Sequence, residues 1–348
     1  MRFLKIIFVL LLLAAISGAA LLYDAARRPF GQFPPGGKFV EIPRGASTRQ
    51  IARTLESHGI VRSSLAFELL ARLRGAQNLQ AGEYFFDRPQ NASQVLQKIA
   101  RGDIYRIQLV IPEGLTIFQV AQRVEAAGLA GADDFLRVAR DPSPVRDIAP
   151  QARSLEGFLF PARYEFPRKT TAQEIAQAMV TTFKREWKTL LDSAPEQTFT
   201  TLHLVTMASL VERETPAQGE RPVIAGVYYN RLRKGIALQC DPTVLYAMDL
   251  AGKNDGIIHA SDLRLDSPYN TYKYRGLPPG PIGNPGTAAL RAALQPQIVD
   301  YLYFVSNLQG GHHFARTLEE HSRNVQRYRQ AVREQSAATG NGTGKRPR

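Results

Sequence analysis

The stretch LVTMASLVERETP, residues 204–216, predicts the helix on which the carboxy-terminal half of this chain is built. Its apolar residues recur at helical spacing, which predicts one buried face. Thr215 precedes Pro216, and the residue before a proline disfavours helix, so the helix should end there. Glu214 then falls in the last turn, next to apolar side chains and near the negative end of the helix dipole. Both surroundings raise the pKa of a carboxyl group.

A carboxylic acid that stays protonated near neutral pH is what protonation of a glycosidic oxygen requires. Glu214 is therefore a candidate general acid, whereas Glu212 projects from another side of the same helix. The alternative interpretation is that both acids belong to a solvated helix end. The helix taken alone favours this second interpretation.

The composition bounds the class of protein. The chain has 348 residues, 44% of them hydrophobic, which suits two or three folded domains. Lys and Arg number 44 against 31 Asp and Glu, so the formal net charge is +13. Nucleic acid, anionic lipid and an anionic cell-wall polymer are partners that fit such a charge. Nucleic acid is not expected, because the sequence has no zinc-finger, RNP-like or basic heptad pattern.

The amino terminus predicts a membrane anchor. Residues 6–23 form an uncharged, mostly apolar run that is just long enough to span a bilayer. Small residues at 18–20 also fit a cleaved signal peptide. A retained transmembrane helix is favoured because the apolar run continues through Tyr23, with residues 1–5 in the cytoplasm and 24–37 as a linker. Basic residues flank both ends of the run, so the charge rule leaves its orientation open.

An internal repeat follows the linker. Residues 40–60 read VEIPRGASTRQIARTLESHGI, and residues 109–129 read LVIPEGLTIFQVAQRVEAAGL. Each copy predicts a short strand, a Pro/Gly turn and a helix closed by a glycine. We therefore expect duplicated small α+β units at 38–104 and 105–185. The first resembles a LysM-like module, a fold that binds peptidoglycan glycan elsewhere, although a role as scaffold is nearly as well supported.

Residues 186–333 are expected to form the catalytic domain. Helical patterns occur at 223–233 and 318–333, a strand is predicted at 300–305, and residues 334–348 should be a disordered tail. The histidines His312, His313 and His321 lack the H-E-x-x-H spacing, and Cys240 is the only cysteine. Patterns for a P-loop, a dinucleotide fold and a serine hydrolase are absent, so no metal or cofactor is expected.

Five ordered motifs together carry a resemblance to a known family. They are MASLVERET, RL-x-x-G-x-x-LQ-x-DPTV, YNTY, GLPPGPI and YLYFV…GGHHF, at residues 207–215, 231–244, 269–272, 276–282 and 301–314. The set is similar to the YceG-like family of endolytic murein transglycosylases. The resemblance implies an α+β protein with one transmembrane helix, duplicated LysM-like units and a carboxy-terminal lysozyme-like catalytic domain. It places that domain outside the cytoplasm, on the periplasmic side of the plasma (inner) membrane.

The resemblance also implies an activity. The family cuts within peptidoglycan glycan strands by a non-hydrolytic route, leaving 1,6-anhydro-MurNAc ends. Its catalytic glutamate falls on Glu214, and Glu212 matches the first acid of the same motif as a supporting residue. Cys240 departs from the small or polar residue that the family commonly has, which puts a direct role for this side chain in doubt. The implied partners are peptidoglycan strands, membrane lipid and peptidoglycan synthases.

Four further residues in these motifs are candidates for holding the sugar and stabilising developing charge: Gln239, Asp241, Asn270 and Tyr272. Two other functions remain open. One is a membrane-tethered scaffold that binds peptidoglycan without cutting it. The other is a muramidase-type hydrolase, in which Glu212 or Glu220 activates water.

Overall fold

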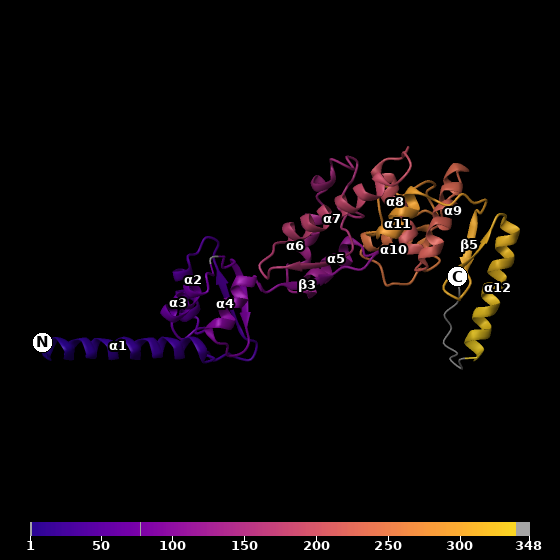
Figure 1. The fold of residues 1–348 in the computed structure, drawn as a ribbon. Coiled ribbons are helices and arrows are strands. Elements are labelled where there is room, and N and C mark those ends of the chain that lie inside the picture. Colours follow the sequence, from indigo (N-terminus) through magenta and orange to yellow (C-terminus); the bar gives the residue numbers. More distant parts are fainter. Residues whose placement is uncertain (1, 77, 339–348) are drawn as a thin grey trace. The chain divides into compact units, whose positions relative to one another are not determined.

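The computed structural model describes residues 2–76 and 78–338. Contacts divide the chain into two compact units, one of Met1–Ile107 with Glu165–Lys169 and the other of Gln108–Tyr164 with Thr170–Arg348. The described residues form α-helices and three two-stranded sheets, so the predicted mixed α+β class is confirmed (Figure 1). The larger unit takes in both the second copy of the repeat and the residues that follow it.

Helix α1 (Arg2–Arg27) contains the predicted apolar run. Within the described residues it is the one helix long and apolar enough to cross a membrane. It extends past the predicted end at Tyr23 into the segment expected to be a linker. Ala26, in its last turn, packs against the core of the first unit.

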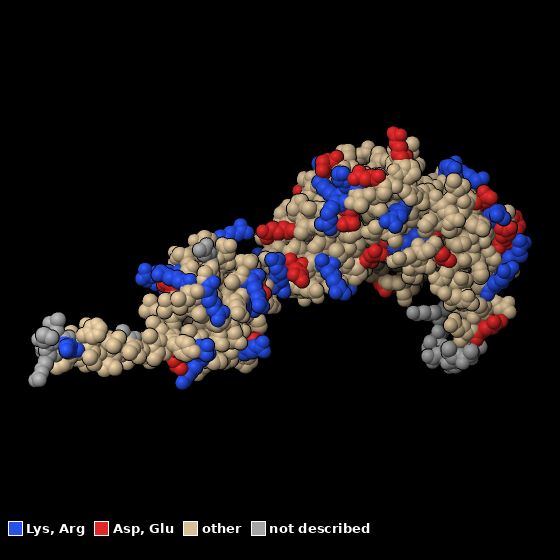
Figure 2. Space-filling view, viewed as in Figure 1, with Lys and Arg blue, Asp and Glu red and all other residues tan. Residues whose placement is uncertain are grey.

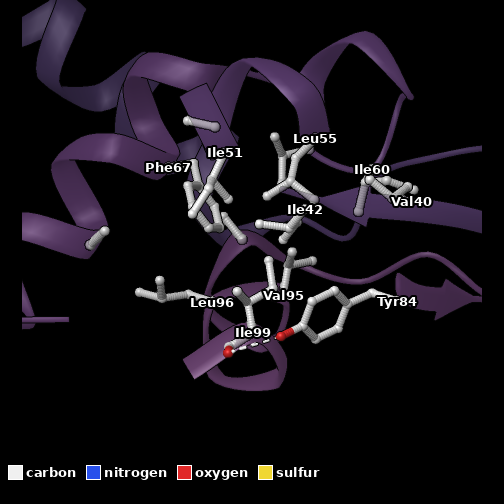
Figure 3. Packing of buried hydrophobic residues seen from close by; sticks show 14 of the residues in the cluster. Val40, Ile42, Ile51, Leu55, Ile60, Phe67, Tyr84, Val95, Leu96 and Ile99 are labelled. Atoms are coloured by element: carbon white, nitrogen blue, oxygen red, sulfur yellow. Dashed lines mark hydrogen bonds between the residues drawn. The ribbon is translucent and has the colours of Figure 1, made fainter. Parts of the chain in front are cut away.

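The first unit has the order strand, two helices, strand, helix. Its elements are β1 (Lys38–Ile42), α2 (Thr48–Ser57), α3 (Ser64–Leu73), β2 (Gly82–Phe86) and α4 (Ala92–Arg101). Strands β1 and β2 pair antiparallel. Ser47 and Asn91 begin α2 and α4 with capping boxes, each closed by a glutamine three residues later. Figure 3 shows apolar side chains from all five elements meeting in one core, where the Tyr84 hydroxyl donates to the Ile99 carbonyl at 3.3 Å.

The second copy repeats this order. Its elements are β3 (Ile107–Val110), α5 (Ile117–Ala126), α6 (Ala132–Ala139), β4 (Arg163–Phe166) and α7 (Ala172–Asp192), with a short 3-10 helix at Ser143–Val145. Equivalent positions have equivalent backbones: φ is +77° at Gly45 and +79° at Gly114. The capping box of Ser47 has its counterpart at Thr116. Each predicted strand, turn and helix is thus present.

The remaining elements follow the central helix α8 (Thr201–Glu214) in the chain. They are α9 (Arg221–Arg233), α10 (Asp241–Leu250), α11 (Thr287–Leu294), β5 (Tyr303–Ser306), β6 (His312–Ala315) and α12 (Leu318–Ala338), with 3-10 turns at Gln218–Glu220 and Asp262–Arg264. Helix α8 packs against α9, α10 and α11, and every residue from Leu204 to Glu212 is buried. The prediction of a single buried face was therefore wrong.

Two further boundaries differ from the sequence-based expectation. Strand β5 begins at Tyr303 rather than at residue 300. Helix α12, which lies beside β5 (yellow in Figure 1), continues to Ala338 rather than ending near residue 333. The rest of the predicted tail, residues 339–348, lies outside the described residues.

Candidate active site

Glu214 is the last residue of α8. The next residue, Thr215, has an extended backbone (φ −141°), so the predicted helix end is confirmed. The Tyr228 hydroxyl donates to Glu214 Oε2 at 2.8 Å, and the Cys240 thiol approaches the same oxygen at 3.4 Å. Burial raises the pKa of Glu214, and the charge of Asp241 raises it further. The bonds from Tyr228 and Cys240 and the nearby His312 act against this rise without reversing it.

Glu214 faces a cleft of about 630 Å³. Of the six candidate residues, the cleft brings together Glu214, Gln239, Asp241 and Tyr272. Strand β5 and helix α12 supply the facing wall, which includes the aromatic side chains Tyr303 and Phe304 and the residues Leu318, His321, Val325 and Arg329. A cleft with aromatic faces and a few convergent polar groups suits a sugar ligand.

Hydrogen bonds join the segment 238–241 to the loop 270–272. The Cys240 amide donates to Thr271 Oγ1 at 3.0 Å, and the Gln239 amide donates to the Thr271 carbonyl at 3.2 Å. Gln239 has a φ of +51°, a left-handed conformation that is uncommon for residues other than glycine. These bonds hold that conformation and turn the Gln239 side chain toward Arg231, whose Nη2 donates to Gln239 Oε1 at 3.2 Å.

Asp241 is a second carboxylate in the same cleft. The Tyr272 hydroxyl donates to Asp241 Oδ1 at 2.6 Å, so two predicted residues form one pair. A residue before a proline and a helical pattern is typical of a helix cap, but here Cys240 is the N-cap of α10. Asp241 is the first residue of that helix and lines the cleft.

The structure does not place Glu212 in the cleft. Glu212 accepts from Arg221 Nη2 at 2.6 Å and from the Gly286 amide at 3.0 Å, and the side chains of Glu212 and Arg221 are both buried. It therefore ties the end of α8 to the first residue of α9 and to the residue that precedes α11. These contacts fix the position of the last turn of α8 and therefore the position of Glu214.

Asn270 and Glu220 also lie outside the cleft lining. Asn270 is fully buried, and its amide donates to the carbonyls of Leu263 and Leu265 at 3.1 and 2.9 Å, which holds the loop before Tyr272. Glu220 contacts Nδ1 of His312 at 2.7 Å and accepts from the His312 amide at 2.9 Å. The two carboxylates considered for water activation, Glu212 and Glu220, are thus both engaged with basic partners.

The turn of the second repeat lies outside the cleft lining, beside the end of α8: a Cβ added at Gly114 would lie 3.5 Å from Glu212 Cγ. Asn284 accepts the Leu159 amide at 2.9 Å and donates to the Leu115 carbonyl at 2.8 Å and to Glu156 at 3.2 Å. Glu156 also accepts the Ile117 amide at the start of α5. Burial raises the pKa of Glu156 to about 8.

Sequence reasoning missed three residues of the site: Tyr228, Arg231 and Tyr303. Arg231 is buried, donates to the Leu238 carbonyl at 2.8 Å and lies 5.3 Å from the centre of the Tyr303 ring. It stands in the R-L-x-x-G motif, so its presence in a motif was the available signal. Tyr303 stands in the YLYFV motif and so carried the same signal, whereas Tyr228 carries none, because a tyrosine in a helix reads as core.

The sequence is similar to one protein family and to named proteins from other organisms. The model of the YceG-like family matches residues 40–327. A Bacillus subtilis protein named endolytic murein transglycosylase is 34% identical over 329 residues, which cover 90% of this chain and 91% of that protein. A Streptococcus pneumoniae protein of the same name is 34% identical over 316 residues, 82% of this chain but 57% of that longer protein.

A crystal structure of a yceG-like protein from Listeria monocytogenes is similar as well. It is 35% identical in sequence, with a TM-score of 0.56, and the match covers 83% of this chain and 98% of that chain. The family model extends from the first repeat through the cleft residues into α12. This chain belongs to the YceG-like family.

Proposed function

We propose that this protein is an endolytic murein transglycosylase. It cuts MurNAc–GlcNAc bonds within peptidoglycan strands and leaves 1,6-anhydro-MurNAc ends. The observation that carries the proposal is Glu214, a half-buried residue with a raised pKa that lines the cleft of about 630 Å³. Membership of the YceG-like family and the names of the relatives support the same activity.

Glu214 has the geometry of a proton donor that can later act as a base. Tyr228 and Cys240 both contact Oε2, which leaves Oε1 to carry the proton toward the glycosidic oxygen. When the proton moves to that oxygen, the C1–O bond breaks and positive charge develops on the MurNAc ring. The ionised Glu214 then takes the proton of the MurNAc C6 hydroxyl, and O6 bonds to C1. Water is not consumed, and the proton taken from O6 returns Glu214 to its protonated form for the next cycle.

The other cleft residues have supporting roles in this scheme. Asp241, held by Tyr272, places negative charge where the oxocarbenium-like sugar would form. Its charge also favours the protonated form of Glu214. Gln239 and Arg231 present polar groups for the sugar hydroxyls. Glu212 and Asn270 act as positioning residues through α8 and the loop before Tyr272.

A muramidase-type hydrolase is the second candidate, and the position of Asp241 favours it. A carboxylate across the bond from the acid is what water activation or a covalent intermediate requires. The bond between Asp241 and Tyr272 leaves its second oxygen available for that purpose. Capture by the C6 hydroxyl is still favoured, because that hydroxyl is already attached to the reacting sugar.

Mass analysis of the products separates the two candidates. Purified glycan strands are digested in ¹⁸O-water, and the new MurNAc ends are weighed. A lytic transglycosylase leaves ends without ¹⁸O that are lighter than hydrolytic ends by one water. Incorporation of ¹⁸O at C1 would assign Asp241 the role of base or nucleophile and refute the lyase scheme. Intact strands after incubation with folded protein would instead favour the peptidoglycan-binding scaffold.

We further propose that α1 crosses the plasma membrane and that all later residues lie outside the cytoplasm, where the substrate is. The length and apolar surface of α1 support the anchor. The orientation is tested with a reporter that works only in the cytoplasm, fused after Arg333: detected activity would overturn it. A mature protein that begins near Leu21 would overturn the anchor. The peptidoglycan synthases remain a predicted class of partner.

A further inference from the structure

Helix α3 presents an apolar face on the surface of the first unit. Leu65, Leu69 and Leu73 follow at four-residue intervals and so share one side of the helix. Their exposed fractions are 67%, 45% and 76%. The opposite side of α3 is buried in the core of the unit. The helix is therefore apolar on both sides, although within residues 2–76 and 78–338 only the core side is covered.

The other helices of the first unit provide an internal comparison. Helices α2 and α4 have the same length as α3 and are described throughout. Their exposed side chains are polar or small, for example Arg53 on α2 and Gln97 on α4. Neither of these two helices exposes a large apolar side chain. The leucine face is thus a property of α3 and not of the unit's surface in general.

Contacts place α3 beside the end of the membrane helix. Helix α1 packs against α3. Asp24, in the last turns of α1, lies 3.9 Å from the guanidinium of Arg62. Arg62 directly precedes Ser63, whose side chain caps the first turn of α3. If α1 spans the bilayer, as proposed above, its end near Asp24 is at the level of the lipid headgroups, and α3 begins at the same level.

The charge of this region matches an anionic surface. The first unit contains 17 Lys and Arg against 8 Asp and Glu, whereas the second unit up to residue 338 contains 24 against 23. Basic side chains predominate on the visible face of the first unit (Figure 2). Around α3, the exposed arginines at positions 28, 62, 72 and 74 outnumber their acidic neighbours Asp24 and Glu68. Such a cluster attracts anionic lipid headgroups.

We propose that α3 docks on the outer surface of the membrane that α1 crosses. Leu65, Leu69 and Leu73 enter the boundary between headgroups and acyl chains, and the surrounding arginines contact anionic headgroups. An apolar helix face with flanking basic residues is the usual pattern of an interfacial helix. The first unit is then held on the bilayer at two points, α1 and α3, instead of turning freely on α1. This inference rests on the proposed membrane anchor.

Lipid quenching of a fluorophore on α3 tests the proposal. The full chain carries Cys240→Ser, a single cysteine in place of Leu69, and an environment-sensitive label on that cysteine. It is reconstituted into vesicles of phosphatidylcholine and phosphatidylglycerol that contain a lipid with a nitroxide on the upper acyl chain. Matched controls carry the label at Arg53→Cys on α2 or Gln97→Cys on α4. We expect several-fold stronger quenching at position 69 than at either control.

Each other outcome has a defined meaning. Equal quenching at the three positions overturns the proposal. The label at position 69 is also tested in detergent without lipid, with a water-soluble quencher. If its protection from that quencher increases with protein concentration, a second copy of the chain covers α3 instead. Adding Leu65→Ser and Leu73→Ser should reduce the quenching several-fold, and unchanged quenching would exclude the leucine face.

Two further controls isolate the parts of the argument. Vesicles of phosphatidylcholine alone should give several-fold weaker quenching, and unchanged quenching overturns the contribution of the arginines. Extraction with alkaline carbonate tests α1 separately. Release of the chain would refute the membrane anchor itself, whereas a retained chain with unquenched position 69 refutes only the docking of α3.

Discussion

The two copies of the repeat have the same elements in opposite surroundings. In the first copy the turn at Gly45 is exposed, and a Cβ added there would meet nothing within 4 Å. In the second copy the Gly114 amide donates to the Asn284 carbonyl at 2.8 Å, and Glu113 lies 3.5 Å from Arg221. Similar local sequence thus builds the same strand, turn and helix. The turn of the first copy is exposed, whereas the turn of the second copy is covered by contacts with later residues such as Arg221 and Asn284.

This difference separates the functions that the copies can have. An open pocket of about 440 Å³ lies beside the turn of the first copy, and its lining includes Arg44, Gln50 and Arg53. The corresponding turn of the second copy is occupied by the protein itself. Glycan binding by the repeats, which the LysM-like resemblance predicts, therefore falls to the first copy. It stays a prediction until binding is measured.

The largest effect expected concerns catalysis, which we assign to the unit that holds the second copy. Glu214→Gln keeps the shape and the bond from Tyr228 but cannot donate a proton. We expect strand cleavage to fall by about 10²–10⁴-fold or more, with binding of strands retained. Arg53→Ala, in the pocket of the first copy, should retain the cleavage rate on soluble strands. Release of new ends over time measures both, and undiminished cleavage by Glu214→Gln would remove that residue from the mechanism.

Ion pairs in the two units should differ in strength. Arg221→Ala leaves Glu212 buried without its charged partner, which typically costs about 3–5 kcal/mol. Arg168→Ala removes a pair with Glu83 at the surface of the first unit, where about 1 kcal/mol is expected. Urea unfolding of the two variants in detergent gives the comparison. Equal losses would show that burial of the Arg221–Glu212 pair does not make it more important for stability than the pair at the surface.

The pH dependence of stability should come from the second unit. Burial holds the pKa of Glu156 at about 8 in the folded chain, above its ordinary value of 4.5. The folded state therefore keeps a proton that the unfolded state releases between these values. The resulting stability is fully present below about pH 4.5 and is lost as the pH rises toward 8, on the order of a few kcal/mol.

Two amide substitutions check this expectation. Glu156→Gln should flatten the decline in unfolding free energy between pH 5 and 8. Asp87→Asn, at an exposed position of the first unit, should leave it as in the unmodified chain. A decline that persists in Glu156→Gln would assign the pH dependence to another buried acid, with Glu214 and Glu212 as the next groups to test.

A smaller effect on stability is expected where Gly283 lies against Gly114, in the turn of the second copy. A Cβ added at Gly283 would lie 2.7 Å from the Gly114 carbonyl oxygen, so backbone must move. Gly283→Ala should cost about 1–3 kcal/mol through overpacking. Gly219→Ala is the control, since a Cβ there meets nothing within 4 Å. Thermal unfolding of the two variants measures the difference in their midpoint temperatures. Equal midpoints would show that the backbone around Gly283 and Gly114 adjusts at little cost.

Local chemistry explains which features the sequence predicted. The end of α8 at Thr215 follows from a proline, the apolar helix α1 from its composition, and the two copies from a repeated pattern. Burial of α8 on all sides was missed because Thr206 and Ser209 look like a polar face. Their hydroxyls instead donate within the helix, to the carbonyls of Leu202 and Thr206 at 2.7 Å each, and so need no solvent.

Distant contacts explain what the sequence could not predict. Asp241 enters the cleft because the loop at Thr271 holds Cys240 in place, 31 residues away in sequence. Asn284 joins the second copy to the segment before α11 across 125 residues, through the Leu159 amide. Neither partner is implied by spacing within a motif. A glutamate such as Glu212, matched by motif to a supporting acid, can likewise serve a buried ion pair.

The bonds of Asn284 have a consequence for how such a chain can evolve. The residues before Gln108 make a module that a lineage could shorten, exchange or multiply, because the machinery of cleavage does not depend on its interior. The second copy no longer has that freedom. Deleting it would leave the buried side chain of Asn284 without the Leu159 amide and the Leu115 carbonyl that now satisfy it. A duplication that began as two interchangeable parts has thus become one replaceable part and one permanent part.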